Sequence, residues 1–87
     1  MTYDIEFTKK ATKELKLIDA KVAKQLMGKI EELAKDPYSK ELDIKKLRGI
    51  NDVYRLRHGK YRVLYEVNNS KLIVTVIKVG ARGEVYG

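Results

Sequence analysis

Three β-rich runs in the second half of the chain, each only a few residues from the next, constrain the fold most. Residues 53–58, 61–67 and 72–79 are rich in valine, leucine, isoleucine and tyrosine, which favour extended backbone. Residues 58–60 (His-Gly-Lys) and 68–70 (Asn-Asn-Ser) lie between them and are typical of turns. Because strands joined by such short turns pair antiparallel, the sequence predicts that these runs form antiparallel neighbours in one sheet.

The first half of the chain predicts one strand and two helices. Residues 3–7 alternate apolar and polar side chains, as a half-buried strand does. Thr8 is a suitable N-cap for a helix over 8–18, and Asp19 for a longer helix that Asp36-Pro37 ends, since the residue before proline avoids the α conformation. The longer helix carries an apolar stripe at helical spacing, formed by Val22, Leu26, Ile30 and Leu33.

Residues 37–51 are expected to form an irregular connection that Leu42, Ile44 and Leu47 hold to the core. The predicted element order is therefore β-α-α-β-β-β. We expect an α+β domain over residues 1–87, with a mostly antiparallel four-stranded sheet and two helices on one face. With 87 residues, the sequence leaves no room for a second independent core.

Several classes of function are excluded by composition. The chain has no cysteine, which removes disulfides, thiolate catalysis and thiolate metal sites. Its acidic residues are scattered and mostly fall on predicted solvent faces, so neither a metal nor another cofactor is expected. The first residues show no secretory signal, and no apolar run approaches the ~20 residues of a membrane span. We therefore expect a cytoplasmic protein with no membrane contact.

The net charge of +7 is distributed unevenly along the chain. Residues 1–44 hold nine lysines and nine acids, whereas residues 45–87 hold ten basic residues and three acids. Arginine grips phosphate through two parallel hydrogen bonds, and all five arginines lie in the second half. An anionic partner, nucleic acid above all, is the leading hypothesis; a merely basic surface is the alternative. The arginines are Arg48, Arg55, Arg57, Arg62 and Arg82.

Because side chains along a strand point alternately to the two faces of the sheet, three of these arginines are expected on one face. Arg55 and Arg57 share one face of their strand, and Arg62 lies on the next strand. A turn at Gly59-Lys60 would place Arg57 opposite Arg62, and a turn at His58-Gly59 would place Arg55 opposite Arg62. A three-residue turn would instead place Arg62 on the other face of the sheet from Arg55 and Arg57. Like charges facing each other across a strand pair destabilise it. The face is therefore either solvated or reserved for an anion.

Four segments resemble the RelE branch of the RelE/ParE toxin superfamily. They are residues 46–49 (KLRG), 53–57 (VYRLR), 59–65 (GKYRVLY) and 79–86 (VGARGEVY). The resemblance spans almost the whole chain, including the helical hairpin. The first and third segments are typical of the superfamily fold. The closing Arg-x-x-x-Tyr resembles the ribonuclease toxins rather than the gyrase-poisoning ParE toxins.

The resemblance implies a type II toxin that enters the A site of a 70S-type ribosome and cleaves mRNA there. It also implies a cognate antitoxin protein, which neutralises the toxin and joins it in repressing their operon, so that operator DNA is contacted only through the antitoxin. The implied active-site residues are Arg55, Arg57, Arg62, Arg82 and Tyr86. The implied RNA-binding residues are Lys46, Arg48 and Lys60.

Proton transfer is the demanding part of such a reaction. The RNA 2′-hydroxyl can attack the adjacent phosphate without a metal if positive groups stabilise the transition state. Arginine, with a pKa above ~12, is a poor general base. Tyr86 could act as the base, stack on a nucleobase, or simply pack on the core, and His58 is expected to be a solvated turn residue. A ParE-like gyrase inhibitor without nuclease activity, or an inactive partner in a repressor complex, remains the alternative.

Overall fold

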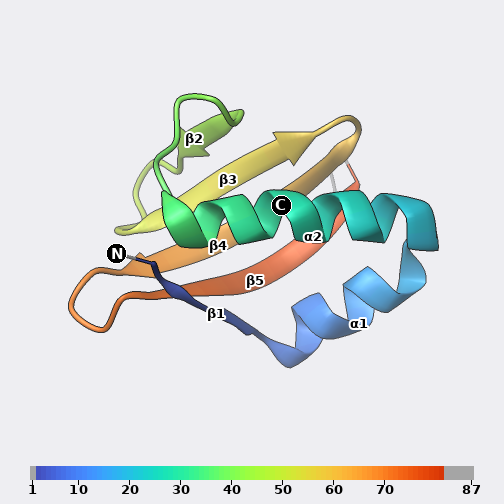
Figure 1. The fold of residues 1–87 in the computed structure, drawn as a ribbon, viewed down its shortest axis with the longest axis horizontal. Helices are drawn as coiled ribbons and strands as arrows, with labels where there is room; N and C mark the ends of the chain where they lie inside the picture. Colours follow the sequence, from blue (N-terminus) through green and yellow to red (C-terminus); the bar gives the residue numbers. More distant parts are fainter. Residues whose placement is uncertain (1, 82–87) are drawn as a thin grey trace.

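The computed structural model describes residues 2–81. Two helices lie on one face of a five-stranded sheet with strand order β1-β5-β4-β3-β2 (Figure 1). β1 pairs parallel with β5, and the other three pairs are antiparallel. The α+β architecture with two helices on one face is confirmed. The elements are β1 (Asp4–Phe7), α1 (Lys9–Leu17), α2 (Ala20–Lys35), β2 (Ile44–Lys46), β3 (Val53–His58), β4 (Tyr61–Asn68) and β5 (Ile73–Ala81).

The helices begin and end close to the predicted positions. The Thr8 hydroxyl accepts a hydrogen bond from the Ala11 N–H at 3.1 Å, and the Asp19 carboxylate accepts one from the Lys21 N–H at 3.2 Å. Each bond satisfies a backbone donor that has no partner within its own helix. α2 ends at Lys35, directly before Asp36-Pro37.

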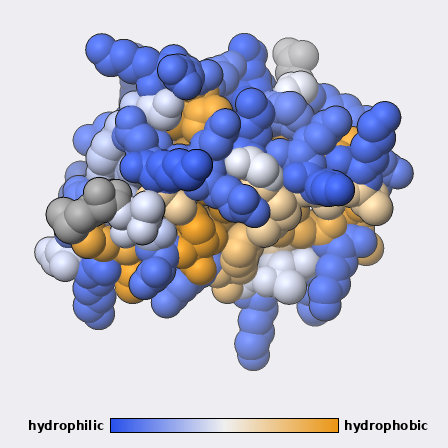
Figure 2. Space-filling model, viewed as in Figure 1, coloured by the Kyte–Doolittle hydropathy of each residue, from blue (hydrophilic) through white to orange (hydrophobic). Residues whose placement is uncertain are grey.

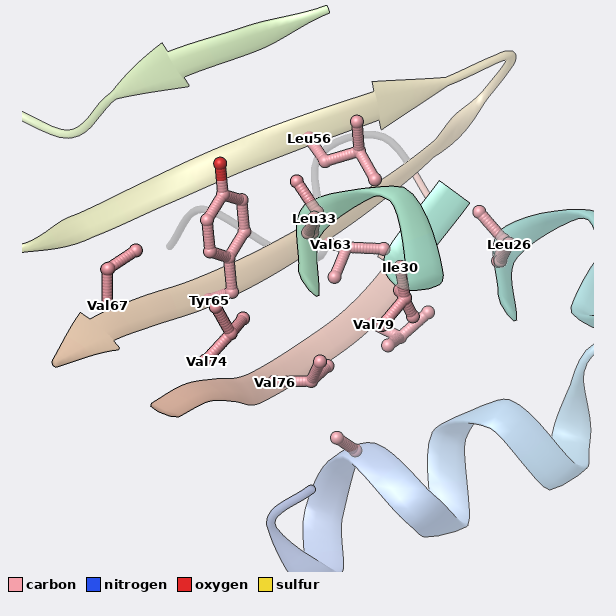
Figure 3. Packing of buried hydrophobic residues seen from close by; sticks show 11 residues of the cluster. Leu26, Ile30, Leu33, Leu56, Val63, Tyr65, Val67, Val74, Val76 and Val79 are labelled. Atoms are coloured by element: carbon pink, nitrogen blue, oxygen red, sulfur yellow. The ribbon is translucent and has the colours of Figure 1, made fainter. Parts of the chain in front are cut away.

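The core lies between the helices and the inner face of the sheet. Leu26, Ile30 and Leu33 of α2 are fully buried there (Figure 3). Their partners from the central strands are Leu56, Val63, Tyr65, Val67, Val74, Val76 and Val79. The Tyr65 hydroxyl donates to the Pro37 carbonyl at 2.6 Å and so ties the loop after α2 to the middle of the sheet. Seen from the helix side, polar side chains cover most of the surface, with apolar patches between them (Figure 2).

The connection over 37–51 is irregular as predicted except at residues 44–46, where the prediction is wrong. It contains β2, which pairs antiparallel with β3 through Ile44 opposite Leu56 and Lys46 opposite Tyr54. The sheet therefore has five strands rather than four. Leu42 and Ile44 pack against the core as expected, whereas Leu47, also expected there, lines a cavity beside Arg55. A three-residue edge strand shows too little alternation to be recognised from sequence, because its pairing with β3 is what defines it.

The hairpin between β3 and β4 has the two-residue turn Gly59-Lys60. His58 pairs with Tyr61, and Arg57 therefore faces Arg62. Gly59 has a φ of 61°, a left-handed conformation that glycine adopts without steric penalty. The structure thus selects the first of the two registers that the sequence allowed.

Candidate active site

Arg55, Arg57 and Arg62 lie on the sheet face that the helices leave open. Their strand neighbours Tyr54 and Leu56 point the other way, into or against the core. Arg57 is directly opposite Arg62, whose partner on the other side is Gly80 of β5. The predicted gathering of three arginines on one face is therefore present. We call Arg55, Arg57 and Arg62 the arginine face.

β2 adds a cation that the sequence did not single out. Lys45 pairs with Arg55 and so extends the arginine face to the edge of the sheet. The sequence could not place Lys45 because β2 itself was not predicted. Its only signal was its position beside Lys46 in the basic segment before Arg48.

Asp43 holds Arg57 in place. The Arg57 Nε lies 2.7 Å from the Asp43 Oδ2, and the Arg57 N–H donates to the Asp43 carbonyl at 2.9 Å. The two side chains are about half exposed, 53% for Arg57 and 44% for Asp43. The carboxylate therefore orients the guanidinium and also offsets one positive charge of the arginine face. From the sequence alone, Asp43 is one of the scattered acids that are expected to face solvent.

Replacing Asp43 by asparagine should tighten the binding of single-stranded RNA by up to about fivefold at low salt, since an exposed ion pair is worth up to ~1 kcal/mol. The substitution removes a negative charge that competes with phosphate for Arg57 and leaves a side chain of the same size. Fluorescence anisotropy with a labelled RNA decamer measures the effect. Asp4→Asn, at the opposite edge of the sheet, is the matched control and should change the affinity less. Equal affinities for wild type and Asp43→Asn would show that Asp43 does not restrain the site.

The predicted RNA-binding residues lie in two places. Lys46 and Arg48 line a cavity of about 260 Å³ together with Lys45, Leu47 and Arg55, so these two cations adjoin the arginine face. Lys60 lies in the hairpin turn, and its Nζ is 5.5 Å from the centre of the Tyr61 ring. The structure therefore brings Lys46 and Arg48 beside Arg55, whereas Lys60 occupies the end of the hairpin.

The end of β5 lies beside Arg62. Gly80 pairs with Arg62, and Ala81, the last described residue, pairs with Tyr61. The strand that the sequence predicts to end at residue 79 continues through Gly80 to Ala81. Arg82 and Tyr86, the remaining predicted site residues, lie outside the described residues.

Glu14 of α1 secures the last part of β5. Its Oε1 accepts a hydrogen bond from the Val79 N–H at 2.9 Å, and its Oε2 lies 3.5 Å from the Lys78 Nζ. β1 pairs with β5 only as far as Val76, so Glu14 satisfies a strand N–H that β1 does not reach. A helix side chain thus supports the segment of β5 that runs beside Arg62. No local sequence pattern marks this role of Glu14, because Val79 lies 65 residues further along the chain.

The His58 side chain lies on the helix side of the sheet, opposite to the arginine face. It ends β3, pairs with Tyr61, and its Nε2 lies 3.3 Å from the Gln25 Oε1 of α2. The expectation of a solvated turn residue is therefore wrong in detail, since His58 is half-buried and contacts a helix. The His58 side chain therefore lies on the helix side of the sheet, whereas the arginine face lies on the other side.

Within residues 2–81, no three histidine or acidic side chains lie close enough together to hold a metal ion. Neither described helix is long and apolar enough to cross a membrane.

The chain was compared with known proteins. The sequence model of the ParE toxin of type II toxin–antitoxin systems, parDE, matches residues 5–86. The chain belongs to the RelE/ParE superfamily of toxins. The mRNA interferase toxin RelE of Escherichia coli K12 is 38% identical over 90 residues, covering 99% of this chain and 92% of that protein. The putative toxin RelE1 of Methanocaldococcus jannaschii is 37% identical over 87 residues, covering 99% and 97%.

Solved RelE structures have the same fold. RelE in the archaeal RelE–RelB complex from Pyrococcus horikoshii superposes with a TM-score of 0.82 at 30% identity, covering 97% of this chain and 99% of that one. The isolated E. coli RelE toxin gives a TM-score of 0.79 at 35% identity, covering 97% and 90%. The resemblance to the RelE branch inferred from the four segments is confirmed, and this chain is a RelE-type toxin.

Proposed function

We propose that this RelE-type toxin is a metal-independent endoribonuclease that cleaves mRNA in the ribosomal A site and so inhibits translation. The observation that carries the proposal is the pairing of Arg57 with Arg62 on the open face of the sheet. Two guanidiniums that face each other across a strand pair cost stability, and an anion bound between them offsets that cost. The name of the E. coli relative, mRNA interferase, supports RNA as the substrate.

The proposed reaction begins with attack of the RNA 2′-hydroxyl on the adjacent phosphorus. A bond from the 2′-oxygen to phosphorus forms, and the bond from phosphorus to the 5′-oxygen breaks. One proton leaves the 2′-hydroxyl and one reaches the departing 5′-oxygen. The products are a 2′,3′-cyclic phosphate and a 5′-hydroxyl end. Arg57, Arg62 and Arg82 hold the phosphate and stabilise the charge of its pentacoordinate transition state, while Arg55 adds to the positive field.

Tyr54 and Tyr65, which stack on each other, do not supply the base. Tyr54 and Tyr65 lie on the helix side of the sheet, away from the arginine face. Burial raises the pKa of both phenols, and the neighbouring tyrosines raise it further, so both phenols stay protonated near neutral pH. Tyr86 is the proposed phenol of the site, as general base or as a stacking surface for a nucleobase. Tyr86→Phe separates the two roles, because phenylalanine keeps the stacking and loses the ionisable group.

The proposed partners follow from the relatives. RelE proteins have been solved in complex with RelB from P. horikoshii and from E. coli. We expect a cognate antitoxin that neutralises this toxin in the cytoplasm, and a toxin–antitoxin complex that represses the operon through antitoxin contacts with operator DNA. Co-expression with the antitoxin should restore the growth that the toxin alone arrests.

Gyrase inhibition is the second candidate function. The matching family model is that of the ParE toxin. A resemblance to the ParE branch of the superfamily implies a gyrase inhibitor that binds its target without nuclease activity. The two functions differ in their targets, so mRNA cleavage and DNA supercoiling assays on one preparation separate them.

A further inference from the structure

A second basic pocket lies on the helix side of β2, across the sheet edge from the arginine face. The loop after α2 and strands β2 and β3 enclose a cavity of about 350 Å³, lined by two tyrosines, two lysines, a serine and two aliphatic side chains. We call it the tyrosine pocket and define it by Tyr38, Tyr54, Lys40 and Lys46. None of these residues except Lys46 belongs to the site proposed above.

The rings of the tyrosine pocket are held in place before any ligand arrives. The Tyr38 ring packs edge-on against Tyr54, with centres 5.3 Å apart, and Tyr54 stacks on the buried Tyr65 at 5.7 Å. Asn69 Nδ2 donates to the Tyr38 hydroxyl at 3.1 Å, and the Tyr38 N–H donates to the Asp36 carboxylate at 3.0 Å. Tyr38 nevertheless stays 43% exposed. A fixed, exposed ring binds a flat ligand with little loss of conformational entropy.

The charges around the tyrosine pocket favour an anionic ligand. Lys40 and Lys46 are both exposed, and no carboxylate is among the described side chains that line the cavity. Burial raises the pKa of Tyr54, and the neighbouring Tyr38 raises it further, so the Tyr54 phenol stays neutral and does not repel a phosphate. An aromatic surface bordered by cations is the combination that binds single-stranded nucleic acid, with a base on the ring and phosphate at the cations.

Lys46 connects the tyrosine pocket with the arginine face. It lines the tyrosine pocket and also the cavity that contains Arg55 and Arg48. β2 is the last strand of the sheet on this side, so no further strand blocks a path around its edge. A single RNA strand can therefore run from the arginine face over Lys46 into the tyrosine pocket.

We propose that the tyrosine pocket binds one nucleotide of the single-stranded RNA substrate outside the cleaved step, with its base against Tyr38 and its phosphate near Lys46 and Lys40. This inference rests on the proposed function, because it takes RNA as the substrate. It adds a nucleotide subsite remote from the scissile phosphate. The pocket would extend the length of RNA that the toxin holds.

The test measures how isolated toxin variants bind a fluorescent uridine decamer by anisotropy. Tyr38→Ala should raise the dissociation constant about tenfold, as expected for the loss of one stacked base. Tyr38→Phe keeps the ring and should stay within about twofold of wild type. Lys46→Gln should lower the slope of log affinity against log salt by about one, as expected for one lost phosphate contact. Circular dichroism and urea unfolding confirm that each variant is folded.

Two results would overturn the inference while leaving the proposed function intact. In the first, folded Tyr38→Ala and Lys46→Gln bind the decamer like wild type while Arg62→Ala weakens it. In the second, Tyr38→Ala weakens only the complex with the antitoxin, so that the pocket serves a protein interface. Failure of the proposed function looks different, because wild-type toxin would then leave mRNA intact on ribosomes whatever the decamer affinities are.

Discussion

Replacing Arg62 by alanine should lower the rate of A-site mRNA cleavage by about a hundredfold or more, the loss typical of removing one preorganised group that stabilises transition-state charge. Arg62 is half-buried on β4, with Arg57 on one side and Gly80, which has no side chain to compete for space, on the other. It therefore lies on the side of the arginine face nearest the end of β5, directly beside Arg57. Primer extension on mRNA from a reconstituted translation reaction measures the cleavage rate.

The controls for Arg62 separate chemistry from folding. Arg62→Lys keeps the positive charge but loses the bidentate hydrogen bonding to phosphate, so it should recover only part of the cleavage rate. Lys71→Ala removes an exposed cation from the turn at the other end of β4 and should leave cleavage nearly unchanged. The free energy of unfolding of Arg62→Ala should stay within ~1 kcal/mol of wild type, because the opposed Arg57 gains from the loss of a like charge. Wild-type cleavage by folded Arg62→Ala would refute the site.

Replacing Leu33 by alanine should lower the free energy of unfolding by about 3 kcal/mol, within the range for fully buried leucines. Leu33 has no exposed surface and packs from α2 onto the central strands. Small domains are stable by only ~5–15 kcal/mol in total, so the loss is a large share. Urea unfolding, monitored by circular dichroism, measures the free energy of unfolding.

Leu17→Ala is the matched control for Leu33→Ala. Leu17 ends α1 and is 87% exposed, so the same substitution should cost less than ~0.5 kcal/mol there. Equal decreases in the free energy of unfolding for the two variants would contradict the burial of Leu33 in the core.

Local signals in the sequence predicted most of the fold. Thr8 and Asp19 cap the helices, and Pro37 follows the end of α2, because each acts on backbone within a few residues. Alternation also predicted the arginine face, since a strand's side chains point to opposite sides in turn. The choice of Gly59-Lys60 as the turn needed the structure, because His58-Gly59 is an equally short turn.

What the sequence could not predict depends on residues distant in the chain. β2 exists only through its pairing with β3, and β1 lies beside β5 through a parallel pairing across most of the chain. The contact between Asp43 and Arg57 and the edge-on packing of Tyr38 against Tyr54 join the loop after α2 to β3. No local pattern marks such contacts, because they form only when the chain folds.

The central claim is that this toxin cleaves mRNA on the ribosome. The most direct measurement adds purified toxin to a reconstituted translation reaction and maps mRNA 5′ ends, with a gyrase supercoiling assay on the same preparation. We predict cuts within A-site codons that require ribosomes and disappear when the antitoxin is added, together with unchanged supercoiling. Intact mRNA with inhibited supercoiling would contradict the account and favour the gyrase-inhibitor alternative.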